Sequence, residues 1–125
     1  MDEVRVLIVD DQELFRGAMA AVVEETHGLT VVGSAASGED SLIAVATLRP
    51  DLVLMDVNMP GMDGIEATRA LTSRPDAPIV MLLSTYDADQ FDLADCGASC
   101  YLAKGALAPE SLSAAWRAAV SESRR

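Results

Sequence analysis

The sequence predicts an α/β fold: a five-stranded parallel sheet in the strand order 2-1-3-4-5, with helices on both faces. Short apolar stretches alternate along the chain with segments in which apolar residues recur at helical spacing. The short stretches are apolar throughout, which is typical of strands covered on both faces. Because neighbouring parallel strands need crossover connections, this alternation predicts a sheet wound on both sides.

The five predicted strands end where the sequence turns polar or rich in turn residues. They span residues 5–9, 29–33, 52–55, 79–83 and 99–103. Asp10 and Asp11 follow the first strand, and Asp56 follows the third. Ser84 follows the fourth strand and Lys104 the fifth. These polar residues are therefore expected at the carboxyl edge of the sheet.

The first two predicted helices are amphipathic. In the first, which Gly28 closes, two adjacent apolar rows recur at helical spacing: Leu14, Ala18 and Val22 beside Phe15, Met19 and Val23. Ser37 and Asp40 have the spacing of a capping box and start the second helix, which ends before Pro50. The side chains expected to be buried from this second helix are Leu42, Ile43 and Ala46.

Three further helices are predicted. The third follows the turn-rich segment 59–64 and spans about 65–73. The fourth, at 88–94, is weak, because it is acidic and has few apolar side chains. Pro109 suits the first turn of the last helix, whose apolar face is formed by Leu112, Ala115, Trp116, Ala119 and Val120.

Length, charge and cysteine content limit the class of protein. A chain of 125 residues has room for one core, so 1–125 is expected to form a single domain, with 121–125 as a candidate start of a linker. The net charge of −11 argues against direct nucleic-acid binding. Cys96 and Cys100 are too few for a disulfide framework. No apolar stretch could span a membrane and no signal peptide begins the chain, so we expect a cytoplasmic protein.

Three carboxylates are expected to converge. In a sheet of this order the first and third strands are neighbours, and ligands bind beyond their carboxyl ends. Asp10, Asp11 and Asp56 lie at these two ends. Two unit charges about 4 Å apart repel by about 4 kcal/mol at an effective dielectric of about 20, so such a cluster needs a compensating cation. Oxygen ligands without a nearby imidazole or thiolate select Mg²⁺ or Mn²⁺ rather than zinc.

Two more residues complete a set suited to phosphoryl transfer. Ser84 offers a hydroxyl and Lys104 offers a mobile cation, both at the same predicted edge as the carboxylates. Phosphoryl transfer to a carboxylate requires a nucleophile, a metal, a hydrogen-bond donor and a cation for the phosphoryl oxygens. Asp56 is the candidate nucleophile.

With these residues in place, the sequence resembles the receiver domains of bacterial two-component response regulators, from about residue 5 to residue 120. The resemblance rests most on 52–64, Leu-Val-Leu-Met-Asp-Val-Asn-Met-Pro-Gly-Met-Asp-Gly, and also on 6–11, Ser84 and 97–104. The details are most similar to the NarL/LuxR-type branch. The resemblance implies a flavodoxin-like receiver fold. It also implies a regulatory phosphoacceptor, not an enzyme, that assists its own phosphotransfer and slow dephosphorylation.

The resemblance assigns roles at the acidic edge. Asp56 would accept a phosphoryl group from a sensor histidine kinase. Asp10, Asp11 and Asp56 would hold Mg²⁺ (or Mn²⁺) together with the backbone carbonyl of Asn58. Pro60-Gly61 fits the centre of a type II turn that could direct this carbonyl toward the metal.

The resemblance also implies a switch. Phosphorylation would draw Ser84 and Lys104 toward the new oxygens and allow Tyr101 to turn inward. The affected face would comprise the predicted helix 88–94, the strand 99–103 and the last helix. In the NarL/LuxR-type branch the output is usually transcription, through a DNA-binding domain that follows the receiver. A homodimer would use this face, or the first and last helices.

Two features depart from the family pattern. The segment between Ser84 and Gly97 is shorter than in typical relatives, so the helix expected there is short or displaced. Many receivers have a proline with a cis peptide bond after the lysine, whereas Gly105 follows it here. A trans bond is expected, because a cis bond without proline costs about 3–4 kcal/mol.

Tyr86 flanks the route by which water would reach the phosphoryl group. This residue is expected to slow hydrolysis of the phosphoryl group.

Three alternatives remain open. The first is a receiver-like interaction module that works without phosphorylation. The second is a Mg²⁺-dependent phosphatase of the haloacid-dehalogenase type, which needs a second aspartate where this chain has Asn58. The third is a flavodoxin-like FMN carrier, whose phosphate loop is rich in Ser, Thr and Gly, whereas Asp10 and Asp11 would repel the FMN phosphate.

Overall fold

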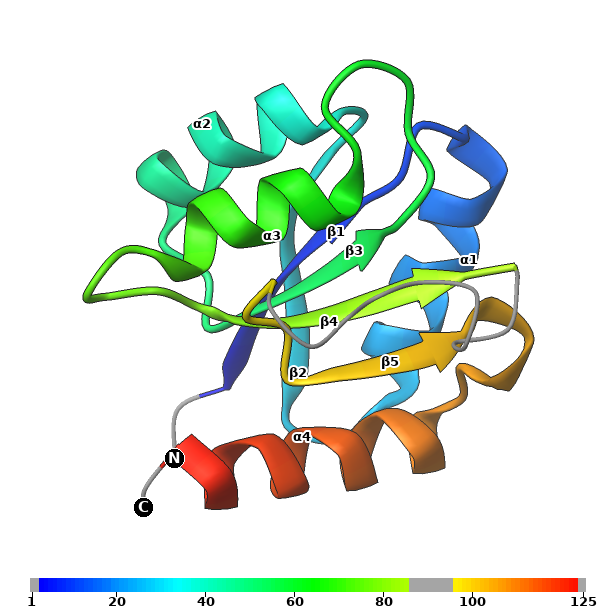
Figure 1. Cartoon of the computed structure of the whole chain (residues 1–125). Coiled ribbons are helices and arrows are strands. Elements are labelled where there is room, and N and C mark those ends of the chain that lie inside the picture. Colours follow the sequence, from blue (N-terminus) through cyan, green and yellow to red (C-terminus); the bar gives the residue numbers. More distant parts are fainter. Residues whose placement is uncertain (1–2, 86–95, 124–125) are drawn as a thin grey trace.

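A five-stranded parallel sheet lies between two layers of helices (Figure 1). The computed structural model describes residues 3–85 and 96–123. The strands are β1 (Val4–Val9), β2 (Leu29–Ala35), β3 (Leu52–Asp56), β4 (Ile79–Ser84) and β5 (Cys100–Ala103). The helices are α1 (Glu13–Glu25), α2 (Gly38–Leu48), α3 (Gly64–Thr72) and α4 (Pro109–Ser123), with a short 3-10 helix, η2 (Lys104–Ala106), after β5. The predicted helix at 88–94 and Tyr86 lie outside the described residues.

The strand order is β2-β1-β3-β4-β5, and all four neighbouring pairs are parallel. The predicted fold class and strand order are therefore confirmed. Among the described residues, no helix combines the length and apolar composition that crossing a bilayer requires.

Each face of the sheet has its own apolar core. In Figure 1, α2 and α3 cover one face, while α1 and α4 cover the other. Alternate residues of β1 belong to the two cores, with Leu7 and Val9 under α2 and α3 and with Val6 and Ile8 under α1 and α4. β3 is buried over its whole length, as its uninterrupted apolar sequence predicts. The central strands β1 and β3 are thereby fixed from both sides.

Local sequence signals set the starts of two helices. The side chain of Ser37 accepts a hydrogen bond from the N–H of Asp40 (3.0 Å), as the predicted capping box requires. Asp63 caps α3 in the same way, because its carboxylate accepts from the N–H of Glu66 (2.8 Å). α1 ends at Glu25, somewhat before the predicted stop at Gly28.

The prediction that α2 buries Ile43 and Ala46 is wrong. Ile43 is 66% exposed and Ala46 is exposed as well. The buried row of α2 contains Ser41 and Val45 instead, and Ile43 lies about 200° around the helix from each of them. A serine can occupy this buried row because its hydroxyl donates a hydrogen bond to the carbonyl of Gly38 (2.6 Å).

The two apolar rows predicted for α1 are also buried to different extents. Met19 and Val23 are buried, and Phe15 and Val22 are partly buried against the same core. Leu14 is 88% exposed. The row of Phe15, Met19 and Val23 therefore faces the sheet, whereas only the Val22 end of the other row packs against the core. In α4, by contrast, the predicted face is confirmed, with Leu112 and Ala119 buried.

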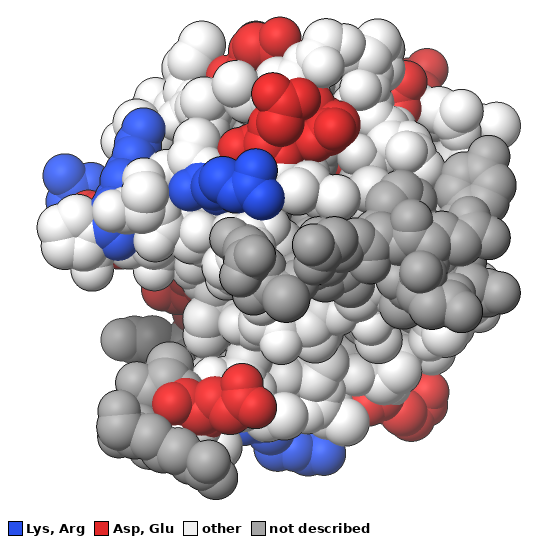
Figure 2. Space-filling view, in the orientation of Figure 1, with Lys and Arg blue, Asp and Glu red and all other residues white. Residues whose placement is uncertain are grey.

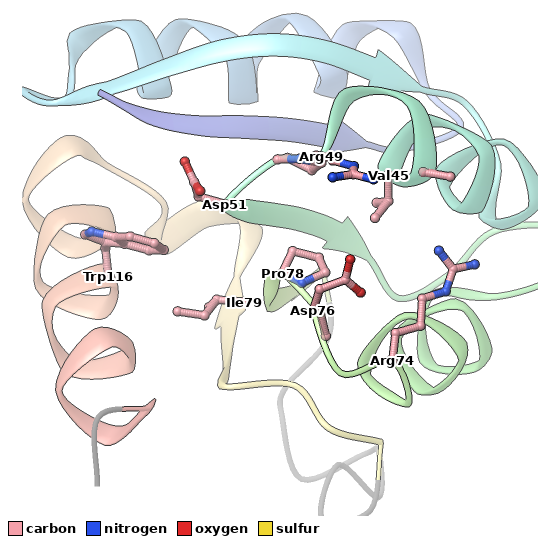
Figure 3. Close-up of a pocket in the computed structure, with 11 residues that line it drawn as sticks. Val45, Arg49, Asp51, Arg74, Asp76, Pro78, Ile79 and Trp116 are labelled. Carbon is pink, nitrogen blue, oxygen red and sulfur yellow. The ribbon is translucent and has the colours of Figure 1, made fainter. Parts of the chain in front are cut away.

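A hollow of about 640 Å³ lies at the amino edge of the sheet (Figure 3). Asp51 and Pro78, which directly precede β3 and β4, line it together with Arg49 and with Trp116 from α4. None of the predicted site residues lines this hollow. Size alone therefore does not identify the functional site of this fold.

Gly64 permits a close contact between β3 and the start of α3. Its N–H donates a hydrogen bond to the carbonyl of Val57 (2.9 Å). A Cβ atom at this position would overlap the carbonyl oxygen of Asp56 and would lie 2.9 Å from Cα of Val57. Both neighbours are backbone atoms, so the overlap could be relieved only by moving the strand end.

We therefore expect Gly64→Ala to lower the free energy of unfolding by about 1–3 kcal/mol, measured by urea denaturation. Gly17→Ala is the matched control, because a Cβ at Gly17 meets no heavy atom within 4 Å. In the middle of α1 this change should raise stability by about 0.5–1 kcal/mol. Equal urea midpoints for the two variants would contradict the contact described at Gly64.

Candidate functional site

The three predicted carboxylates meet at the carboxyl edge of the sheet. One oxygen from each of Asp10, Asp11 and Asp56 lies within 4.8 Å of the others. Asp10 is fully buried, Asp56 is 4% exposed and Asp11 is exposed. The cluster therefore runs from the interior to the surface, and the predicted convergence is confirmed.

Three hydrogen bonds from or to neighbouring segments fix the position of Asp10. Its N–H donates to the carbonyl of Ala35 (3.1 Å), which keeps it in line with β2. Its carboxylate accepts a hydrogen bond from the N–H of Gln12 (2.9 Å). The guanidinium of Arg16 donates to its backbone carbonyl (2.7 Å). The first turns of α1 thus fix the position of Asp10.

Lys104 supplies the compensating positive charge. Its Nζ atom lies 2.7 Å from an oxygen of Asp10 and 3.2 Å from an oxygen of Asp56. It is the only lysine in the sequence. Its ammonium also lies 3.9 Å from the centre of the Phe15 ring. Lys104 therefore has two carboxylates and one aromatic ring as partners.

Burial raises the pKa of Asp56 from 3.8 to about 6, and the charge of Asp10 contributes in the same direction. The ammonium of Lys104 and the backbone N–H of Asn58 oppose the rise. Burial disfavours the charged form of a carboxyl group, and a second carboxylate nearby disfavours it further. The ammonium of Lys104 and the N–H of Asn58 therefore offset only part of the cost of a negative charge on Asp56.

The loop after β3 forms one wall of the site. Gly61 has a φ of 75°, as expected for the third residue of the predicted type II turn at Pro60-Gly61. The N–H of Val57 donates to the carbonyl of Leu83 (2.9 Å) and ties the loop to β4. Asn58 is exposed and lines the pocket. The direction of its carbonyl toward a metal stays a prediction.

A pocket of about 280 Å³ opens beside the carboxylates. Its lining comprises Asp11, Gln12, Phe15, Asp56, Asn58, Thr85 and Lys104. Ser84, the predicted hydroxyl donor, ends β4 with no exposed surface, and the exposed Thr85 next to it lines the pocket. Tyr101 is partly buried against the core under α2 and α3. The switch roles of Ser84 and Tyr101 stay predictions.

Four contributors to the site were missed in the sequence: Gln12, Phe15, Arg16 and Thr85. The signal for Gln12, Phe15 and Arg16 was their position just after Asp10 and Asp11, where the chain enters α1 at the edge of the sheet. The helical spacing of Phe15 predicts only that it belongs to an apolar row. Its second contact, with Lys104, joins residues that are far apart in the sequence and cannot be recognised from helical periodicity.

Surface charge alone does not identify the site. Figure 2 shows one face of the molecule, on which basic side chains lie interspersed with acidic ones. The acidic excess of the chain, 20 acidic against 9 basic residues, is not confined to the site. What distinguishes the site is the short distance between carboxylates and the burial of two of them.

The donor set fits a hard divalent cation. The cluster offers carboxylate oxygens from three residues, and no histidine or cysteine belongs to it. Mg²⁺ and Mn²⁺ prefer such oxygen ligands, whereas zinc prefers nitrogen and sulfur.

The raised pKa predicts a pH dependence of stability in metal-free buffer. Between pH 3.8 and about 6 the folded protein binds more protons at Asp56 than the unfolded chain does. The stabilisation from protonated Asp56 is thus complete below about pH 4 and is lost as the pH rises through about 6. The loss should approach about 3 kcal/mol, from about 1.4 kcal/mol for each pKa unit.

Urea unfolding with EDTA across this pH range would measure the effect. Asp56→Asn should lack this component and be more stable than the parent chain at pH 7. Parallel pH profiles for the parent and Asp56→Asn would contradict a raised pKa at this position.

Comparisons with known proteins agree with this geometry. The sequence matches the family described as response regulator receiver domain over residues 6–117. Response regulator GacA of Pseudomonas viridiflava is 46% identical over 106 residues, which cover 82% of this chain and 49% of that protein. Response regulator UvrY of Escherichia coli is 42% identical over 113 residues, covering 89% of this chain and 52% of that protein.

Solved structures agree as well. The signal receiver domain of the response regulator NarL from Mycobacterium tuberculosis has a TM-score of 0.81 and 30% identity, with coverage of 93% of this chain and 98% of that one. A LuxR-family response regulator from Aurantimonas sp. has a TM-score of 0.85 and 28% identity, with coverage of 97% and 87%.

This chain spans about half the length of the curated relatives it matches. A protein-glutamate methylesterase/protein-glutamine glutaminase of Alkalilimnicola ehrlichii is also 42% identical, but over only 27% of its length. The chain therefore resembles a segment of proteins that differ in name and in the share of their length that it covers. The family match favours a signalling switch over the phosphatase and the FMN carrier. The chain belongs to the response regulator receiver domain family.

Proposed function

We propose that this chain is a phosphorylation-controlled signalling switch in which Asp56 accepts a phosphoryl group. One observation carries the proposal. The carboxylate of Asp56 borders an open pocket, and the ammonium of Lys104 lies 3.2 Å from one of its oxygens. A nucleophilic oxygen and a mobile cation are thus side by side at a surface that a phosphoryl donor can reach.

In the proposed reaction, a carboxylate oxygen of Asp56 forms a bond to phosphorus while the bond from phosphorus to the leaving group breaks. The leaving group departs with the electron pair, as a histidine imidazole of a sensor kinase or as acetate from acetyl phosphate. The ammonium of Lys104 stabilises the phosphoryl oxygens, and the hydroxyl of Ser84 donates a hydrogen bond to them once it turns toward the pocket.

Asp10, Asp11, Asp56 and the backbone carbonyl of Asn58 would hold Mg²⁺ or Mn²⁺. When bound, the cation neutralises charge on the carboxylates and on the phosphoryl oxygens. The close approach of the three carboxylates supports this assignment, because among the described residues only Lys104 forms ion pairs with them, one positive charge against three negative ones.

The proposed switch couples the site to the face near β5. Phosphorylation adds roughly −1.5 to −2 charges, which draws Lys104 away from Asp10 and moves Ser84, and Tyr101 then turns inward. The partners would be a sensor histidine kinase and a second copy of the chain. Transcription is the proposed output, with a DNA-binding part in the full protein, as the resemblance to the NarL/LuxR-type branch implies. The proposal includes a single domain over 1–125 and a cytoplasmic location.

Incubation with acetyl phosphate and Mg²⁺ tests the chemistry. The parent chain should gain about 80 Da by intact mass, the increment of one phosphoryl group. Asp56→Asn should gain nothing, because it lacks the nucleophile. Asp76→Asn is the control, since this exposed aspartate lies at the opposite edge of the sheet. A gain that persists in Asp56→Asn, or no gain in the parent, would refute Asp56 as the acceptor.

Titration with Mg²⁺ tests the metal site separately. The free energy of unfolding of the parent should rise by about 2.7 kcal/mol when free Mg²⁺ is about 100 times its dissociation constant, and by about 1.4 kcal/mol for each further tenfold increase. Asp11→Asn should lose most of the rise, while Asp76→Asn should keep it. Ionic strength is held constant with KCl, because screening alone stabilises an acidic chain. If Asp11→Asn responds like the parent, the cation binds elsewhere.

A further inference from the structure

We propose that Phe15 is a positioning residue, whose ring holds the ammonium of Lys104 at the mouth of the acidic pocket. The inference rests on the proposed function and extends it to a residue outside the carboxylate, hydroxyl and lysine set. The observation behind it is the distance of 3.9 Å between Nζ of Lys104 and the centre of the Phe15 ring. A cation at this distance from an aromatic ring is attracted by the negative charge of the ring face.

The backbone around Lys104 does little to aim its side chain. Gly105 follows it, is exposed and has open space around its Cα, with no heavy atom within 4 Å of a Cβ built there. The described peptide bonds are all trans, as the glycine predicts. Lys104 also begins the short 3-10 helix η2, in which only three residues take part. Its four-carbon side chain must therefore be held by its contacts.

Of the three partners that the described residues provide for this ammonium, only the ring takes no part in the proposed reaction. The other two are oxygens of Asp10 and Asp56, at 2.7 Å and 3.2 Å. Both carboxylates are proposed metal ligands, and Asp56 also becomes the phosphorylated group. The contact with Phe15 has no directional hydrogen bond, so it can persist while the ammonium exchanges a carboxylate oxygen for a phosphoryl oxygen.

Phe15 is well placed for this task because its helix is fixed to the acidic site. The neighbouring Arg16 donates to the backbone carbonyl of Asp10 (2.7 Å). Further along α1, Met19 and Val23 are buried in the core. The ring itself is partly buried and packs against that core. Because α1 is held in place by these contacts, Phe15 gives the side chain of Lys104 a fixed surface to pack against.

The ring also separates two spaces. It lines the acidic pocket together with Asp56, and it lines an apolar slot of about 300 Å³ together with Met19 and Val22. Lys104 borders both spaces. Contact with an aromatic ring beside an apolar slot is stronger than the same contact in open water, because less water competes for the cation.

The ring charge can be tested apart from its volume. Phe15→Leu keeps an apolar side chain but removes the ring, whereas Phe15→Tyr and Phe15→Trp keep a ring. At saturating acetyl phosphate with Mg²⁺, Phe15→Leu should acquire the phosphoryl group about tenfold more slowly than the parent. Phe15→Tyr should stay within about twofold of it. Leu14→Ala, an exposed change in the same turn, should match the parent.

A double-mutant comparison shows whether Phe15 acts through the lysine. In a Lys104→Met background, the further change Phe15→Leu should not slow phosphorylation any more, because the cation that the ring holds is already absent. If Phe15→Leu slows the reaction equally in both backgrounds, its role is structural packing and the inference is overturned.

A spectroscopic test needs no reaction. Because Lys104 is the only lysine, lysine labelled with ¹³C gives one set of side-chain signals. The protons next to the ammonium should be shifted upfield by the ring in the parent, and this shift should vanish in Phe15→Leu and return in Phe15→Trp. An unshifted signal in the folded parent overturns the inference. Failure of the parent to gain mass would instead refute the proposed function.

Discussion

The site depends on the adjacency of β1 and β3. Parallel pairing places their carboxyl ends at one edge, and this brings the oxygens of Asp10, Asp11 and Asp56 within 4.8 Å of one another. Such a cluster is unfavourable unless positive charge is brought to it. The surrounding features serve this need: β5 delivers Lys104, α1 delivers the backbone and ring contacts, and the loop after β3 closes one wall.

The two buried carboxylates are supported unequally, and the difference suits their proposed roles. Asp10 accepts from the N–H of Gln12 and pairs with Lys104 at 2.7 Å, so its charge is well compensated. Asp56 has the longer contact with Lys104, at 3.2 Å, and its pKa is raised to about 6. The well-compensated carboxylate of Asp10 thus lies beside Asp56, whose ionised form is destabilised by burial. Binding of a cation, or reaction of the carboxylate, would relieve this destabilisation.

The parts predicted from the sequence are those in which local pattern and topology agree. Apolar runs predicted the strands, and the adjacency rule for the sheet then predicted where Asp10, Asp11, Asp56 and Lys104 meet. Predictions failed where the type of residue does not reveal the burial or the contacts of its side chain. Ile43 is exposed because a serine with an internal hydrogen bond occupies the buried row of α2. Phe15 touches Lys104 through a contact that depends on three-dimensional packing and that no spacing rule contains.

The pairing of Asp10 with Lys104 joins positions that are 94 residues apart. During synthesis on the ribosome, the acidic end of β1 emerges early, but its cation arrives only after four more strands have been made. Until then the early carboxylates repel one another without relief, so premature closure of this edge is disfavoured. The charge at this edge is therefore balanced only after β5 and Lys104 have left the exit tunnel.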